Sequence, residues 1–142
     1  VYRDKLNIQE SKEGDILPAL LFFIVIVTIL LKVESEGTFG YSIGGHLPSN
    51  VSYADDIATL SRSSRELQRF LDIIAKYSAE VGLFAIVSKT ECMTSYKNSP
   101  PLNITIYGMP IKPVSEYVYL DHKLSSINDG TASVKYRIGL GW

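Results

Sequence analysis

The longest apolar run of the chain extends from Ile16 to Leu31 and is broken only by Pro18 and Thr28. Asp15 suits a helix N-cap and Pro18 suits a first helical turn, so the run predicts a helix. Because the run has no polar stripe, we expect a helix that is buried on all sides in a larger fold. The alternative is a membrane span. At 1.5 Å per residue the run is about 24 Å long, short of the ~30 Å hydrocarbon core, which favours the buried helix.

A second helical pattern covers Ser63 to Val81 and has apolar residues at helical spacing, namely Leu67, Phe70, Leu71, Ile74 and Val81. Ser63 and Glu66 have the spacing of a capping box, and Gly82 provides a C-terminal stop. We therefore expect a helix that turns this apolar stripe toward a core.

Short apolar segments predict strands. Val51 to Tyr53 and Ile57 to Leu60 flank an Asp-Asp pair, which falls where a tight hairpin would turn. The Gly-rich stretch 36–49 predicts a loop with a short hairpin. Further segments are expected as follows: strands over Asn103 to Tyr107 and Glu116 to Leu120, a turn at Gly108-Met109-Pro110, and the start of a helix over Ser133 to Leu140. The pattern predicts a mixed α/β (α+β) fold with a short antiparallel sheet and helices on one face.

Composition narrows the function classes. The 142 residues carry a net charge of −1 without a stripe of Lys and Arg, which argues against strong nucleic-acid binding by this chain alone. The single Cys92 excludes an internal disulfide and fits a cytoplasmic or nuclear compartment. A zinc-type Cys/His cluster, a Gly-rich phosphate loop and the Gly-x-Ser-x-Gly motif of serine hydrolases are all missing from the sequence.

The Asp55-Asp56 pair is the main candidate for chemistry. Two neighbouring carboxylates repel each other, so either their proton affinity rises or a cation lies between them. Mg²⁺ prefers such hard oxygen ligands and is usually held by one or two carboxylates together with substrate phosphates. The pair therefore indicates nucleotidyl transfer, and a solvated turn without chemistry is the alternative.

Four blocks follow one another in a fixed order along the chain, at residues 13–22 (Glu-Gly-Asp-Ile-Leu-Pro-Ala-Leu-Leu-Phe), 53–56 (Tyr-Ala-Asp-Asp), 82–91 (Gly-Leu, then Ser-Lys-Thr-Glu) and 117–124 (Tyr-Val-Tyr-Leu-Asp-His-Lys-Leu). This succession resembles the reverse transcriptases of non-LTR (LINE-like) retrotransposons. The resemblance covers about residues 10–140. It implies a partial polymerase palm over 10–124 and the start of a thumb over 125–142.

The resemblance also implies roles for individual residues. Asp55 would be the principal Mg²⁺ ligand of a two-metal site, and Asp56 a weaker ligand beside it. Tyr53 would support the primer terminus. Gly14 and Asp15 would lie near the template and the incoming nucleotide. Lys89 would neutralise or protonate the departing phosphate, with an ordinary solvated lysine as the alternative. The implied partners are an RNA template, a DNA primer and a dNTP, and no membrane is expected.

Several departures from the family pattern predict that this chain is inactive alone. The family block that carries the first Asp of the metal site has no counterpart upstream of Glu13, which itself replaces the usual Gln. Ile86 replaces an Asn, and Asp121 replaces a Gly. We interpret the chain as a truncated or degenerate palm, with a non-catalytic retroelement relic and a single-span membrane protein anchored by residues 16–31 as alternatives. Without upstream cover, the apolar run should leave an exposed patch and make the chain poorly soluble.

Overall fold

The computed structural model describes residues 16–95, 100, 102–120 and 122–126, and over this part the chain has an α+β fold. It contains two α-helices, α1 (Ile16–Ser35) and α2 (Ser64–Glu80), and one short 3₁₀ helix, η1 (Val87–Lys89). The strands are β1 (Asn50–Tyr53), β2 (Asp56–Thr59), β3 (Glu91–Cys92), β4 (Thr105–Ile106), β5 (Met109–Pro110), β6 (Lys112–Pro113), β7 (Glu116–Tyr119) and β8 (His122–Ser125). The mixed α+β class predicted from the sequence is confirmed.

α1 is longer than the sequence pattern predicted, since it ends at Ser35 and not at Leu31. The extension has a packing reason, because Val33 is fully buried and continues a stripe of buried side chains at helical spacing. This core face of α1 consists of Ile26, Ile29, Leu30 and Val33. The predicted N-cap, Asp15, lies outside the described residues.

The opposite side of α1 is not covered by the described part of the chain. Leu17, Leu20, Leu21, Phe23, Ile24 and Leu31 are each between 49% and 61% exposed. The expectation of a helix buried on all sides is therefore wrong here. The expected apolar patch is present, because the described elements supply cover for one face only.

α2 begins and ends where its signals predicted. Ser63 takes an extended conformation as N-cap and its hydroxyl accepts a hydrogen bond from the Glu66 backbone N–H at 3.2 Å. Gly82 adopts φ +76 just after the helix. In a complete capping box the Glu66 carboxylate would also accept a hydrogen bond from the Ser63 backbone N–H. Here it accepts instead from the Gly40 N–H at 2.8 Å and from Arg62 Nε at 3.1 Å. Glu66 thereby fixes the loop that precedes β1 to the first turn of α2.

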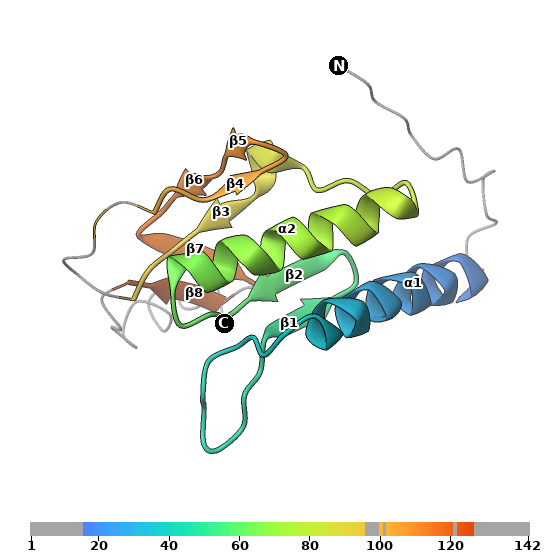
Figure 1. The fold of residues 1–142 in the computed structure, drawn as a ribbon, viewed down its shortest axis with the longest axis horizontal. Helices are drawn as coiled ribbons and strands as arrows, with labels where there is room; N and C mark the ends of the chain where they lie inside the picture. The colour runs from blue at the N-terminus through green and yellow to red at the C-terminus, as the bar shows by residue number, and fades with distance from the viewer. Residues whose placement is uncertain (1–15, 96–99, 101, 121, 127–142) are drawn as a thin grey trace, which may run out of the picture.

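Two small cores lie along α2. The first joins α1 to α2, where the buried rings of Phe39 and Phe70 meet edge to face at 5.4 Å. The second consists of buried residues from the strand region and the α2 side chains packed against them, namely Cys92, Ile104, Ile106 and Ile111 with Leu67 and Leu71. α2 is thus the central element between α1 and the β3–β6 region (Figure 1).

The described strands form four two-stranded sheets, three of them antiparallel and one, β3 with β6, parallel. The strand predicted over Asn103 to Tyr107 is shortened to β4. The turn lies at Tyr107-Gly108, both with positive φ, so Met109 and Pro110 belong to β5 and not to the turn that we predicted. β7 was expected, whereas β8 and the β3–β6 pair were not.

Candidate functional site

The predicted carboxylate hairpin is present. β1 and β2 pair antiparallel with Tyr53 opposite Asp56, so Ala54 and Asp55 form a two-residue turn. Ala54 occupies the left-handed region at φ 53, a conformation that tight hairpin turns require and that alanine adopts at a cost. The register places Asp55 at the tip of the hairpin and Asp56 at the start of β2.

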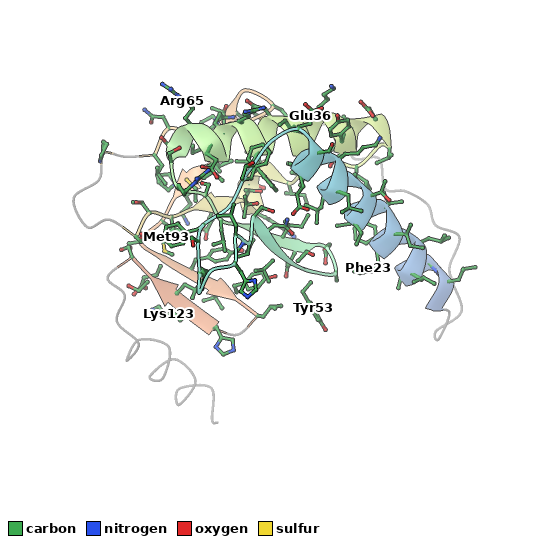
Figure 2. The ribbon with its side chains drawn as sticks, turned by 60° about the horizontal axis from the view of Figure 1, so that its bottom comes forward. Phe23, Glu36, Tyr53, Arg65, Met93 and Lys123 are labelled. Carbon is green, nitrogen blue, oxygen red and sulfur yellow. The ribbon has the colours of Figure 1, made fainter. Side chains whose placement is uncertain are left out.

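Tyr53, Asp55 and Asp56 are all exposed to solvent. The Tyr53 side chain is 65% exposed and points away from the ribbon at the hairpin tip (Figure 2). An exposed ring beside two exposed carboxylates leaves all three side chains free to contact an external molecule. The carboxylate oxygens are hard ligands that can bind a divalent cation from solution.

The β7–β8 hairpin lies against the carboxylate hairpin. The Tyr119 hydroxyl donates a hydrogen bond to the Val51 carbonyl oxygen at 3.2 Å. Burial raises the pKa of Tyr117 above its usual value, and the negative charges of Asp56 and Glu91 raise it further. In the sequence, Tyr117 and Tyr119 stood out only as part of the last motif. They lie two residues apart on β7, and this spacing could have placed both side chains on the same face of the strand.

The remaining candidates do not join this group. Lys89 ends η1, is exposed, and forms no ion pair with Asp55 or Asp56 in the described part of the chain. Gly14 and Asp15 lie outside the described residues, as does Asp121. The structure thus places Tyr53, Asp55 and Asp56 on one hairpin, and the Tyr119 hydroxyl of β7 contacts the backbone of the same hairpin at Val51.

The donor set limits how a metal could be held. Over residues 16–95, 100, 102–120 and 122–126, no group of three or more His, Cys, Asp or Glu side chains converges as metal ligands. At the hairpin, Asp55 and Asp56 offer a metal ion two carboxylates from neighbouring residues. This set fits Mg²⁺ only in the mode where waters and substrate phosphates complete the coordination shell.

In comparisons with known proteins, neither a protein-family model nor a curated protein matches this chain. The resemblance to non-LTR reverse transcriptases therefore stays an expectation from the order of the four sequence blocks.

Proposed function

We propose that the chain is part of the palm of an RNA-directed DNA polymerase of the non-LTR retrotransposon type. The observation that carries this proposal is the position of Asp55 and Asp56 at the exposed turn of a two-stranded antiparallel hairpin. Two-metal nucleotidyl transfer requires carboxylates that reach metal ions beside the reacting phosphate. A hairpin tip meets this requirement, because its side chains can approach a bound duplex without obstruction.

The surroundings of the hairpin support the same proposal. Tyr53 presents an exposed ring next to the carboxylates, where it can contact the sugar or base at a primer terminus. The β7–β8 hairpin supports β1 from the side through the hydrogen bond of Tyr119 to Val51. In this proposal Asp55 is the main Mg²⁺ ligand, Asp56 a weaker one, and Lys89, Gly14 and Asp15 contact the nucleotide and the template. The metal supplies charge neutralisation at the transferring phosphoryl group.

Within the described part of the chain, two of the carboxylates that such a site needs are assigned, Asp55 and Asp56. The proposal therefore describes a partial site, which becomes competent only with a further carboxylate from a segment encoded upstream. If no such segment is encoded, the chain is a non-catalytic relic of a retroelement.

The decisive experiment uses the genomic sequence upstream of residue 1. We expect an open frame that encodes an aromatic segment with Phe-x-x-Ala-Phe-Asp, and we expect the extended protein to incorporate dNTPs on a primed RNA template. Asp55→Asn should abolish incorporation. Glu80→Gln, which changes an exposed carboxylate in a weak 4.0 Å ion pair with Lys32, is the matched control and should retain it.

Two results would contradict the proposal. One is an extended protein that binds a primed template but incorporates no dNTP. The other is incorporation that survives Asp55→Asn. Stop codons or frameshifts upstream would favour the relic.

A further inference from the structure

The base of the carboxylate hairpin is tied to the end of α1 by one buried hydroxyl group. Ser49 lies directly before β1 and is only 4% exposed. Its hydroxyl donates a hydrogen bond to Glu34 Oε1 at 2.8 Å and accepts one from Asn50 Nδ2 at 2.9 Å. The Ser49 carbonyl oxygen accepts from the Leu60 N–H at 2.8 Å, just after β2. Ser49 therefore joins both sides of the hairpin base to α1.

Glu34 acts in this contact as a hydrogen-bond acceptor. It lies in the last turn of α1 and forms no ion pair among the residues that the structure describes. Because the Ser49 oxygen already accepts from Asn50, its single hydroxyl proton is directed to the Glu34 carboxylate. A buried hydroxyl that loses its partner destabilises the fold, which favours the formation of this bond.

Two other contacts hold the hairpin less directly. Ile57 of β2 packs against the core between α1 and α2, but apolar attraction has no preferred direction. The bond from the Tyr119 hydroxyl to the Val51 carbonyl oxygen is longer, at 3.2 Å, and lies in an exposed position, where water competes for both groups. The bond between Ser49 and Glu34 is therefore the shorter and better shielded directional contact between the hairpin and its surroundings.

A small rotation at the base has a large effect at the tip of the hairpin. At about 3.4 Å per residue in an antiparallel strand, Ala54 lies about 17 Å beyond Ser49. A rotation of about 3–4° about Ser49 moves the tip by about 1 Å, an error that costs about 10²-fold in rate at a catalytic site. The side chains of Asp55 and Asp56 form no ion pair with other described residues, so their positions follow the hairpin as a whole.

We propose that Glu34 is a positioning residue for the carboxylates of the hairpin. Through Ser49 it fixes the direction of β1 and β2 relative to α1, and thereby the positions of Asp55 and Asp56. This inference rests on the proposed function, because it concerns the same two carboxylates. Glu34 itself contacts neither the metal nor the nucleotide.

Three variants test this role. Glu34→Ala removes the acceptor, whereas Glu34→Gln keeps a carbonyl oxygen that can accept from Ser49. Glu36→Ala is the matched control, because Glu36 also accepts a hydrogen bond from a hydroxyl, that of Tyr77, but this bond joins the chain after α1 to α2. Circular dichroism should show that all three variants fold, because Glu34 and Glu36 are both exposed.

Pulsed electron paramagnetic resonance measures the direction of the hairpin on the full chain. Nitroxide labels at Tyr53→Cys and Arg65→Cys, in a Cys92→Ala background, report the distance between the hairpin tip and α2. Both label sites are exposed and point away from the ribbon (Figure 2). The distance distribution should be the same in the wild type, Glu34→Gln and Glu36→Ala. In Glu34→Ala it should shift or broaden by at least about 1 Å.

The extended protein tests the consequence for the reaction. Glu34→Ala should lower kcat for dNTP incorporation at least about tenfold and leave KM for the dNTP within about twofold, because the displaced carboxylates act in the transition state. Glu34→Gln and Glu36→Ala should keep the wild-type kcat. A merely structural role would lower kcat as much in Glu36→Ala as in Glu34→Ala.

The outcomes separate this inference from the proposed function. If the extended wild-type protein incorporates no dNTP, the proposed function fails, and the distances between the labels still decide whether Glu34 fixes the hairpin. Unchanged distances in Glu34→Ala would overturn the inference, as would equal losses of kcat in Glu34→Ala and Glu36→Ala. A Glu34→Gln variant that behaves like Glu34→Ala would also overturn it, because the charge and not the hydrogen bond would then matter.

Discussion

The side-chain amide of Gln68 pairs with the backbone of Thr105 as a neighbouring strand would. The Thr105 N–H donates to Gln68 Oε1 at 2.8 Å, and Gln68 Nε2 donates to the Thr105 carbonyl oxygen at 2.9 Å. Asp72 holds the amide in place by accepting a second hydrogen bond from Gln68 Nε2 at 2.7 Å. This contact joins α2 to the edge of β4 and satisfies two part-buried backbone groups at once.

Replacing Gln68 by Ala should therefore destabilise the fold by about 1–3 kcal/mol, because two part-buried backbone groups lose their partners. Urea denaturation followed by circular dichroism measures the change. Arg65→Ala on the same helix is the control, since Arg65 is exposed and points away from the fold (Figure 2). A Gln68→Ala variant as stable as Arg65→Ala would show that water replaces the amide without cost.

The sequence predicted those parts of the fold that depend on neighbouring residues, and it did not predict contacts between residues far apart in the chain. The hairpin at Tyr53 to Asp56 and the ends of α2 were predictable, because alternation, capping and a terminal Gly are local signals. The pairing of Gln68 with Thr105 was not predictable, since 37 residues separate the partners. β3 and β6 are two residues long, and β6 ends in Pro113, so neither shows alternation.

The candidate site was predictable in part for the same reason. The positions of Asp55 and Asp56 depend on one turn, which the flanking apolar residues indicate. The hydrogen bond of Tyr119 to Val51 depends on how two hairpins pack, which no local pattern encodes. The apolar run of α1 predicted a helix correctly, but a run without a polar stripe cannot reveal which face the core will cover.

Gly40 is expected to tolerate no side chain. It adopts φ +116, and a Cβ built there would lie 2.4 Å from the Pro48 carbonyl oxygen. Gly40→Ala should destabilise the fold by more than about 2 kcal/mol, through backbone strain and a clash with backbone atoms. Gly44→Ala is the matched control, because Gly44 also has positive φ but would place its Cβ in open space. Thermal unfolding measures the stability of both variants. An equal loss of stability in Gly40→Ala and Gly44→Ala would rule out the clash as the cause.

Stability should fall at alkaline pH, in part through Tyr77. The pKa of Tyr77 is raised above 10.0, first because its hydroxyl donates to Glu36, then by desolvation and by the charges of Glu36 and Glu80. The folded state thus binds this proton more tightly than the unfolded state does. The resulting stabilisation is complete below pH 10 and is lost as the pH rises through the raised pKa. Across this pH range, the urea midpoints of the wild type and of Tyr77→Phe should become more similar as the pH rises. A constant difference between them would contradict the assignment.

The chain alone should bind Mg²⁺ or Mn²⁺ weakly. Asp55 and Asp56 supply two neighbouring carboxylates, and Mg²⁺ keeps its waters unless several hard ligands converge. Relaxation of water protons by Mn²⁺ should show little specific binding to the purified chain. Tight stoichiometric binding that Asp55→Ala abolishes would mean that a further ligand completes the site.

The chain alone should also fail to extend a primer on an RNA template. Metal ions held at fixed positions must neutralise the charge on the transferring phosphoryl group. Two carboxylates at one hairpin tip cannot fix the positions of these ions. Misplacement by about 1 Å already costs about 10²-fold in rate, so a site without its further carboxylate should stay below detection. Extension of a labelled primer by the purified chain tests this, with Asp55→Asn as the background. Template-dependent synthesis above that background would show that another carboxylate of this chain, with Asp15 as the first to replace by Asn, completes the site.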